Sequence, residues 1–234
     1  MTNVAVILAG GMGTRVGGNI PKQLIPLSDG RSVLEHSVDA FEAASCIDEI
    51  VIVMHPEWLK EAEELSRRNA WQKVRQIIAG GSERWESSWH AIQAISSSLA
   101  GRNEVGLFLH DAARPFVSQR ILADVAEALE THAAVTVAVP VTDTLYKVES
   151  LELSVERSLK VESIPARADF MRAQTPQAFH LDVLQKAFER ALTQGQVAVT
   201  DDVGIVQAYM PEQPIFIVSG EEANRKITYA EDLK

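Results

Sequence analysis

The sequence is poor in cysteine, since Cys46 is its only one in 234 residues. A single cysteine permits neither an intrachain disulfide nor a metal site made of several thiolates. We expect Cys46 to pack as a small apolar residue rather than to act as a nucleophile. The six histidines show no metal-ligand spacing, so a histidine-based metal centre is not expected either.

Long hydrophobic runs are absent as well. No apolar stretch approaches the roughly 18 residues that a membrane-spanning helix requires. The start, Met1-Thr2-Asn3, leads directly into an apolar strand and lacks the charged and apolar regions of a signal peptide. We therefore expect a cytoplasmic protein that does not associate with a membrane.

Positive charge is scarce, because 22 Lys and Arg stand against 32 Asp and Glu and give a net charge of −10. A protein that binds nucleic acid usually presents a broad basic face, which this composition argues against. A site for an anionic ligand must therefore be a local cluster of cations. The length and the 46% hydrophobic content are ordinary for one large domain, or for one domain with a protruding subdomain.

Strand-like aliphatic runs alternate with helix-like segments along most of the chain. Strands are expected at 4–8, 47–54, 74–79, 105–109, 135–139 and 214–218, with a short extended piece at 23–27. Helices are expected at 32–44, 56–69, from about 84 onward, 118–132, 180–192 and 202–209, the first opening on a Ser32/Glu35 capping box. This alternation predicts a mainly parallel, right-handed α/β sheet with helices on its faces.

One segment departs from the alternation. Residues 141–148 and 159–164 read as two strands joined by a long polar turn over 149–156, after which 165–177 returns to the body. Together they form a β-arm at about 141–172. Because a two-stranded arm is marginal in water alone, we expect it to pack against a second copy of the chain and form a homodimer.

The first expected strand ends abruptly in a glycine-rich loop that contains Gly10, Gly11, Gly13, Gly17 and Gly18. Glycines let backbone N–H groups turn inward and approach phosphate oxygens. The same loop carries the cations Arg15 and Lys22. It therefore favours a polyphosphate ligand, although a glycine-rich turn with incidental surface charges remains an alternative.

The spacing of this loop excludes two common phosphate-binding motifs. A dinucleotide-binding G-x-G-x-x-G would need glycine where Val16 stands, and a Walker A loop would need Gly-Lys-Ser/Thr where Lys22 follows Pro21. Instead, Leu8-Ala-Gly-Gly-x-Gly-Thr-Arg15 followed by Pro21-Lys-Gln23 resembles the signature of sugar-phosphate and polyol-phosphate nucleotidyltransferases. In that family the loop wraps the triphosphate of the nucleotide.

Two further strand ends carry polar residues and should meet the loop at one edge of the sheet. The first continues as Gly80-Gly81-Ser82-x-Arg84-x-x-Ser87, whose backbone and hydroxyl groups suit a base and a ribose. The second continues as His110-Asp111-Ala-Ala-Arg114-Pro. A carboxylate at such a strand end suits Mg²⁺ shared with phosphates, whereas local pairing of Asp111 with Arg114 is the alternative, and His110 is expected to be structural.

The resemblance extends over almost the whole chain. The His110-Asp-Ala-Ala-Arg-Pro segment, Pro140-Val-x-Asp-Thr144, Arg172-Ala-Gln-Thr-Pro-Gln-Ala-Phe179, Thr200-Asp-Asp202 and Lys226-Ile-Thr228 occur in the order seen in 2-C-methyl-D-erythritol 4-phosphate cytidylyltransferases and ribitol-5-phosphate cytidylyltransferases. The resemblance implies a Rossmann-like three-layer α/β nucleotidyltransferase fold, CTP as the nucleotide and Mg²⁺ as the cofactor.

The resemblance also implies roles for individual residues. It assigns Arg15 and Lys22 to catalysis and the triphosphate, and Asp111 to the metal. It assigns nucleotide binding to Ala9, Gly10, Gly11, Gly13, Thr14, Gly80, Gly81, Ser82, Arg84, Ser87 and Ala112. The polyol phosphate is assigned to Arg114, Thr144, Arg167, Thr200 and Lys226, with Thr144 and Arg167 reaching in from the arm of the partner subunit.

The acceptor stays open between two polyol phosphates. Leu8-Ala-Gly-Gly resembles the ribitol branch, and Ser82 stands where many methylerythritol enzymes have aspartate, whereas His110-Asp-Ala-Ala-Arg-Pro and Thr200-Asp-Asp resemble the methylerythritol branch. We favour methylerythritol phosphate. Two other classes remain, a nicotinamide-dependent oxidoreductase, which the missing third glycine disfavours, and a regulator that binds nucleotide without turnover.

Overall fold

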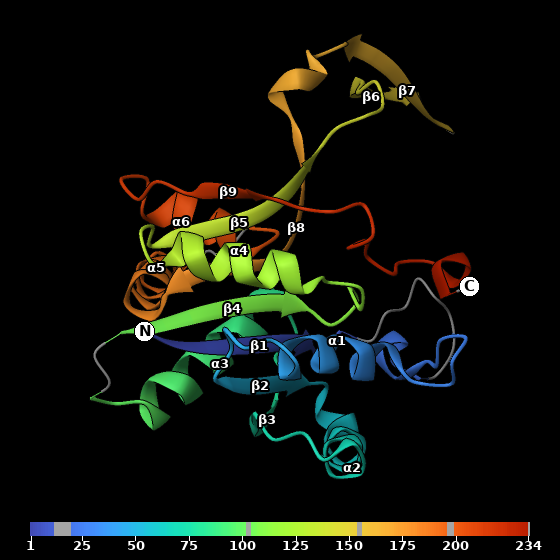
Figure 1. Cartoon of the computed structure of the whole chain (residues 1–234). Helices are drawn as coiled ribbons and strands as arrows, with labels where there is room; N and C mark the ends of the chain where they lie inside the picture. The colour runs from blue at the N-terminus through green and yellow to red at the C-terminus, as the bar shows by residue number, and fades with distance from the viewer. Residues whose placement is uncertain (12–19, 102–103, 154–155, 196–198, 234) are drawn as a thin grey trace.

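The protein's structure, a computed structural model, describes residues 1–11, 20–101, 104–153, 156–195 and 199–233. Within these residues seven strands form one sheet in the order β3-β2-β1-β4-β8-β5-β9 (Figure 1). Their bounds are β1 Thr2–Ala9, β2 Glu49–Met54, β3 Val74–Ala79, β4 Val105–Asp111, β5 Ala134–Pro140, β8 Met171–His180 and β9 Phe216–Ser219. All neighbours pair in parallel except β8, which is antiparallel to β4 and β5. The predicted mainly parallel α/β sheet is confirmed.

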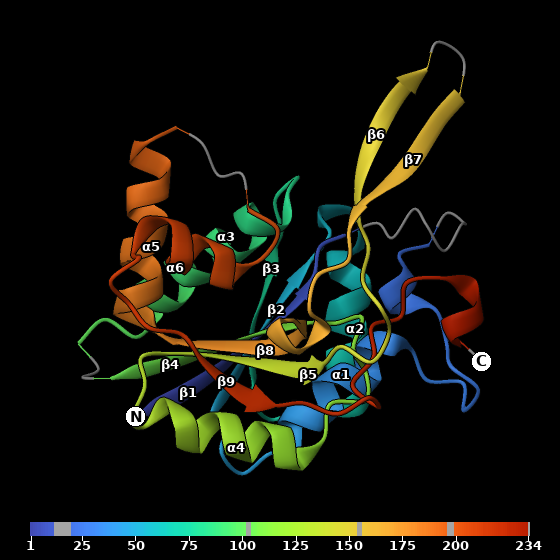
Figure 2. The ribbon, with the colours of Figure 1, turned by 90° about the horizontal axis from the view of Figure 1, so that it is seen from above.

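Helices cover both faces of the sheet and make three layers (Figure 2). On one face lie α1 Val33–Glu42, α2 Leu59–Asn69 and α4 Gln119–Leu129, and on the other lie α3 Arg84–Ser98, α5 Leu181–Thr193 and α6 Asp202–Tyr209. Strand β1 supplies both cores, because Ala5 and Ile7 face the first set of helices while Val4 and Val6 face the second. An apolar run without polar alternation is what burial on both faces requires.

Local signals position several helices as expected. Ser32 caps α1, and its side chain and that of Glu35 form the predicted capping box. Ser118 caps α4 through the amide of Ile121, and Asp201 caps α6 through the amide of Gly204. Cys46 is partly buried beside the α1 core, and burial raises the pKa of its thiol, as a packing role requires.

Three expectations about the backbone outside the β-arm are wrong. The piece expected to be extended at 23–27 begins as the 3-10 turn η1 Lys22–Leu24, because Pro21 fixes φ at −52° and leads into a turn. A second such turn, η2 Pro56–Trp58, precedes α2. The third error is β8, because 165–177 was expected to return to the body and no strand was expected there. Pro176 fits within this central strand because the β5–β8 register shifts between Thr136 and Val137, which leaves Pro176 outside the paired positions.

The β-arm consists of β6 Lys147–Leu153 and β7 Glu156–Ser163, and it projects away from the main sheet (Figure 1). The expected long turn over 149–156 is wrong, since strand pairing continues to Leu153 and Glu156. Cross-strand ion pairs of Lys147 with Glu162 and of Lys160 with Glu149 explain why this polar stretch forms strands. Among the described residues no helix is long and apolar enough to cross a membrane.

Candidate active site

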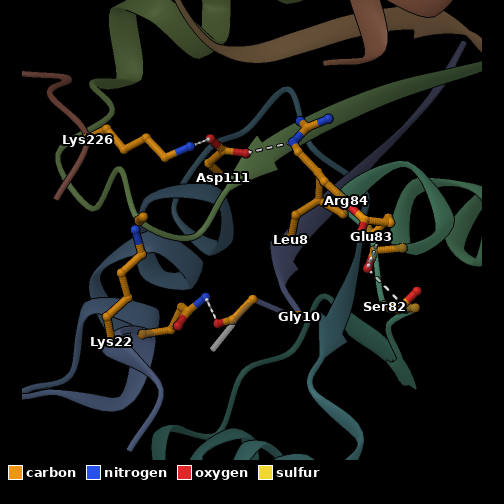
Figure 3. A pocket seen from close by; sticks show the side chains of 13 residues that line it. Leu8, Gly10, Lys22, Ser82, Glu83, Arg84, Asp111 and Lys226 are labelled. Carbon is orange, nitrogen blue, oxygen red and sulfur yellow. Dashed lines mark hydrogen bonds and ion pairs between the residues drawn. The ribbon is translucent and has the colours of Figure 1, made fainter. Parts of the chain in front are cut away.

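The predicted meeting of strand ends is present as a cleft of about 280 Å³ at the carboxyl edge of the sheet (Figure 3). The end of β1, η1, the loop before α3, the end of β4 and the C-terminal segment each contribute to it. Its lining residues are Leu8, Gly10, Gly11, Lys22, Gln23, Gly81, Ser82, Glu83, Arg84, Ser87, Asp111, Ala113 and Lys226. Nine of the residues singled out from the sequence therefore share one cavity.

Gly13, Thr14 and Arg15, together with Gly17 and Gly18, lie in 12–19, outside the described residues. Of the two predicted catalytic cations, the structure therefore positions Lys22.

Asp111 is the central anion of the cleft. Its Oδ1 accepts a hydrogen bond from Nε of Arg84 at 3.2 Å, and its Oδ2 accepts one from Nζ of Lys226 at 2.6 Å. Figure 3 shows the two cations approaching this carboxylate from opposite sides. Burial by itself would raise the pKa of Asp111, but Arg84 and Lys226 lower it far below its usual range. Asp111 is therefore an anion at neutral pH.

Arg84 joins this carboxylate to a second one. Its Nη1 donates to Oδ2 of Asp202 at 2.7 Å, across 118 positions of sequence. Burial would lower the pKa of Arg84, yet the two carboxylates raise it above its usual value. The chain of charges therefore runs from Asp202 through Arg84 and Asp111 to Lys226.

A buried network behind the cleft holds the backbone of Asp111. His110 is fully buried, and its Nε2 lies 3.0 Å from the carbonyl of Arg114, which only accepts, so this nitrogen carries the proton. The Nδ1 atom then accepts from the hydroxyl of Thr175 at 3.0 Å, and that hydroxyl accepts from the amide of Asp111 at 3.2 Å. Burial lowers the pKa of His110 to about 4, so the ring stays neutral. His110 is structural, as expected.

Lys22 and Gln23 tie η1 to two other walls of the cleft. Nζ of Lys22 donates to the carbonyl of Ile227 at 2.8 Å, and Nε2 of Gln23 donates to the carbonyl of Gly11 at 2.9 Å. Lys22 is buried, which is unusual for lysine and leaves its ammonium at the cavity rather than in bulk water. The mouth of the cleft thus brings Lys22 and Lys226 to the same cavity.

The loop before α3 is rigidly braced. A single oxygen, Oε2 of Glu86, accepts from the amide and hydroxyl of Ser82, both at 2.7 Å, and from the amide of Glu83 at 3.2 Å. The amide of Gly81 donates to Oγ of Ser87 at 3.1 Å. A Cβ at Gly80 would lie 2.8 Å from this Oγ, and one at Gly81 would lie 2.2 Å from Cβ of Glu86. Glycine is therefore required at both positions by close packing.

The remaining predicted residues lie in three different settings. Ala9 and Ala112 are fully buried beside the cleft, and the amide of Ala112 donates to the carbonyl of Leu8. The guanidinium of Arg114 donates to the carbonyls of Asn224 and Ala173, so it holds the segment that carries Lys226 and does not pair with the Asp111 side chain.

The acceptor residues predicted on the arm and before α6 do not line this cleft. Thr144 and Arg167 are exposed near the base of the arm, where Arg167 donates to the carbonyl of Thr142 at 2.7 Å. Thr200 is exposed just before α6. Within the described part of the single chain, these three side chains are therefore not gathered with Lys226.

Sequence reasoning missed several residues of the site. Gln23 and Glu83 line the cleft and Asp202 braces Arg84. Gln23 and Asp202 belong to the motifs Pro21-Lys-Gln23 and Thr200-Asp-Asp202, which could have indicated both residues. The contact between Asp202 and Arg84 has no local signature, because α6 and α3 are brought together only by the fold.

A mainly parallel α/β sheet whose carboxyl edge combines a glycine-rich strand end with Lys22, Arg84 and Lys226 around the anionic Asp111 is the arrangement of a nucleotidyltransferase. The family model "IspD: 2-C-methyl-D-erythritol 4-phosphate cytidylyltransferase" matches residues 3–234. The chain belongs to this family, whose members are CTP-dependent cytidylyltransferases.

Individual relatives agree with this assignment. The 2-C-methyl-D-erythritol 4-phosphate cytidylyltransferase of Thermobifida fusca is 43% identical over 229 residues, which cover 98% of this chain and 89% of the relative. The bifunctional ribulose 5-phosphate reductase/CDP-ribitol pyrophosphorylase Bcs1 of Haemophilus influenzae is 37% identical and is covered over 46% of its length. The solved 4-diphosphocytidyl-2C-methyl-D-erythritol synthase of Anaerococcus prevotii aligns with a TM-score of 0.80 at 26% identity, over 99% of this chain and 92% of the other.

Proposed function

We propose that this protein transfers CMP from CTP to 2-C-methyl-D-erythritol 4-phosphate and releases pyrophosphate, a step in the synthesis of isoprenoid precursors. A phosphate oxygen of the acceptor attacks the α-phosphorus of CTP, and the bond from that phosphorus to the β-phosphate oxygen breaks. The observation that carries the proposal is the meeting of Lys22, Arg84, Asp111 and Lys226 in one cleft beside Gly10 and Gly11. We place the reaction in the cytoplasm, where CTP is made.

The cations of the cleft have the task of holding two anions in line. Phosphoryl chemistry of this kind needs positioning and charge stabilisation more than covalent help. Lys22 is buried at the cavity and serves the triphosphate together with Arg15, while Lys226, whose side chain is 38% exposed, receives the phosphate of the acceptor. Arg84 contributes positive charge on the nucleotide side, next to the loop that we assign to the base.

The donor set of the cleft fits Mg²⁺. This ion usually takes one or two protein carboxylates, and completes its shell with waters and substrate phosphates. Asp111 offers two anionic oxygens at the cavity, and Lys226 and Arg84 now occupy them. When bound there, Mg²⁺ would neutralise charge on the nucleotide phosphates.

The loop 80–87 is the proposed site of the cytosine and ribose. The glycines allow close approach, and the hydroxyls of Ser82 and Ser87 are fixed by their hydrogen bonds to Glu86 and to the loop backbone. A fixed loop loses little entropy when a base binds.

A homodimer through the arm is part of the proposal, which treats residues 1–234 as one nucleotidyltransferase domain with a dimerisation arm at about 141–172. Tyr146, Leu159, Val161 and Ile164 expose apolar side chains along the arm, and Leu159 is 68% exposed. Large apolar side chains exposed together on one projecting arm favour an interface. Pairing of two arms would bring Thr144 and Arg167 of one chain to the acceptor side of the other.

Ribitol 5-phosphate is the second candidate acceptor, because the Haemophilus influenzae relative is named a CDP-ribitol pyrophosphorylase. The deciding experiment supplies CTP, Mg²⁺ and both polyol phosphates together and identifies the CDP-linked product by mass spectrometry. Exclusive formation of 4-CDP-2-C-methyl-D-erythritol supports the proposal. CDP-ribitol as the main product would show that the acceptor is ribitol 5-phosphate. Failure to release pyrophosphate from CTP with either acceptor would overturn both candidate functions.

A further inference from the structure

Asp202 stands behind the cleft and touches it only through Arg84. It is the first residue of α6, is fully buried, and does not line the cavity. Its Oδ2 accepts from Nη1 of Arg84 at 2.7 Å, while Nε of the same guanidinium donates to Asp111 at the longer distance of 3.2 Å. The shorter of the two contacts of Arg84 is therefore the one that points away from the ligand space.

The burial of Asp202 is not explained by stability alone. A buried carboxylate is costly unless its oxygens are paired, and replacing a buried ion pair by apolar residues is often neutral or stabilising. Among the described residues, Oδ1 of Asp202 is buried and has no hydrogen-bond partner, and Arg84 is the one side chain there that binds this carboxylate. The buried Asp202 carboxylate is costly and its side-chain contact is with Arg84, which indicates that its role concerns the Arg84 guanidinium.

The start of α6 is fixed by other contacts. Oε1 of Gln177 accepts the amides of Asp202 at 3.1 Å and Val203 at 3.2 Å, and Nε2 of Gln177 donates to Asp201 at 2.7 Å. Asp201 in turn caps the amide of Gly204 at 2.9 Å. The Asp202 carboxylate is therefore not needed to begin the helix.

We propose that Asp202 is a positioning residue that holds Arg84 in place while Asp111 exchanges its protein partners for a divalent cation. A metal at Asp111 would compete with Arg84 and Lys226, because each oxygen of this carboxylate already accepts a hydrogen bond from one of them. Arg84 keeps its contact with Asp202 during this exchange. Its charge therefore stays beside the nucleotide and does not compete with the metal for Asp111. The proposal rests on the nucleotidyl-transfer function given above.

The matched test compares Asp202→Asn with Asp201→Asn, which alters the neighbouring carboxylate that does not contact Arg84. Binding of CTP is measured by calorimetry over a series of Mg²⁺ concentrations, without acceptor. We expect Asp202→Asn to weaken Mg²⁺-dependent CTP binding about tenfold or more, because Arg84 then pairs more strongly with Asp111 and competes with the metal. We expect Asp201→Asn to change this affinity less than about threefold. Equal affinities for Asp202→Asn and the wild type would overturn the proposal.

A double-mutant cycle separates positioning from a structural role. In an Arg84→Gln background Asp202→Asn should add little, because the group through which it acts is gone, whereas a structural role would give the same loss in both backgrounds. Independent losses therefore refute the proposal. If the wild type itself does not bind CTP, the proposed function fails instead, and the two failures are distinguished.

A measurement on the unchanged chain does not depend on a folded variant. In nitrogen-15 NMR spectra, the Nη hydrogens of an arginine held at two sides rotate slowly and give resolved signals. The resonances of Arg84, assigned by comparison with Arg84→Lys, should stay resolved after Mg²⁺ and CTP are added. Averaging of these signals on binding would show that Asp202 does not retain the guanidinium and would contradict the proposal.

Discussion

Nζ of Lys226 lies 2.6 Å from Oδ2 of Asp111, although the two residues are 115 positions apart. The C-terminal segment that carries Lys226 is held against the sheet by the Arg114 guanidinium and by the buried amide of Asn224, which donates to the carbonyl of Thr175. The fold thus provides Asp111 with a cation before any ligand is bound. A divalent metal at this carboxylate would compete with that cation.

Replacing Asp111 with asparagine should lower kcat/KM by about 100-fold or more, since preorganised charge at a reacting phosphate supplies several kcal/mol. The amide keeps the shape but cannot bind Mg²⁺ as an anion, so the Mg²⁺ concentration that gives half-maximal rate should rise. Steady-state kinetics over a metal series check this. Asp124→Asn, an exposed carboxylate on α4 that pairs with Arg120, is the control. If the metal dependence of Asp111→Asn is unchanged, Asp111 is not the metal ligand.

Lys22→Ala and Arg15→Ala should each reduce turnover by orders of magnitude while the fold persists, because both cations are assigned to the triphosphate. Lys22 also donates to the carbonyl of Ile227, so some loss of thermal stability is expected for this variant. Turnover and thermal unfolding are measured side by side. Lys60→Ala changes an exposed lysine of α2 and should leave turnover intact. Near-normal turnover in Lys22→Ala would refute its role.

Glu86→Gln should raise the KM for CTP roughly tenfold with a smaller change in kcat. One carboxylate oxygen accepts three donors from Ser82 and Glu83, and an amide oxygen accepts the same donors more weakly. The loop would then have to be ordered by the nucleotide itself. Glu63→Gln, on the exposed surface of α2, is the matched control. A fall in kcat alone, with KM unchanged, would contradict a role in nucleotide binding.

Leu159→Asp should convert a dimer into a monomer in sedimentation experiments at micromolar concentration, because a charge on the exposed apolar side of the arm opposes burial. If the arm also completes the acceptor site, the KM for the polyol phosphate should rise more than that for CTP. Leu192→Asp alters another exposed leucine, at the end of α5 and away from the arm, and should change neither property. A wild-type chain that sediments as a monomer would exclude the arm interface.

The sequence predicted those parts of the fold that depend on local chemistry. The capping box of Ser32 with Glu35, the apolar run of β1 and the bounds of β3 each follow from residues a few positions apart. Strand β8 was missed because Pro176 argues against a central strand, and only the register shift opposite Thr136 and Val137 accommodates it. The turn of the arm was misplaced because strand pairing, with the cross-strand ion pair of Glu149 and Lys160, extends into that polar stretch.

The site was predicted only in part, because some of its contacts likewise have no local signal in the sequence. Strand ends of a parallel sheet meet at one edge, so Gly10, Gly81 and Asp111 were expected together from the alternation of strands with helices. No such rule joins Lys226 or Asp202 to Asp111 and Arg84, because these contacts cross 115 and 118 positions and depend on how β8 and the C-terminal segment pack. Arg84 and Lys226 were named as site residues, but their contacts with Asp111 required the three-dimensional structure.

The buried His110 makes stability depend on pH. Its pKa is lowered from 6.5 to about 4 in the folded protein, whereas the unfolded chain retains the ordinary value. Between these two values the unfolded state binds more protons, so the contribution is complete above about pH 6.5 and is lost progressively as the pH falls toward 4. Lowering the pH from 7 to 5 should therefore reduce the free energy of unfolding by about 2 kcal/mol through this group.

Chemical denaturation at pH 7 and pH 5 measures this loss, with His110→Asn as the comparison. The variant should be less stable than the wild type at pH 7, because it loses the contact of His110 with Thr175. It should lose less stability on acidification, because asparagine does not titrate. His132→Asn is a surface control, as the His132 ring lies against Phe216 outside this network. If the wild type and His110→Asn lose stability equally between pH 7 and pH 5, His110 is not the group that titrates, and the neutral ring assigned to the network behind Asp111 is wrong.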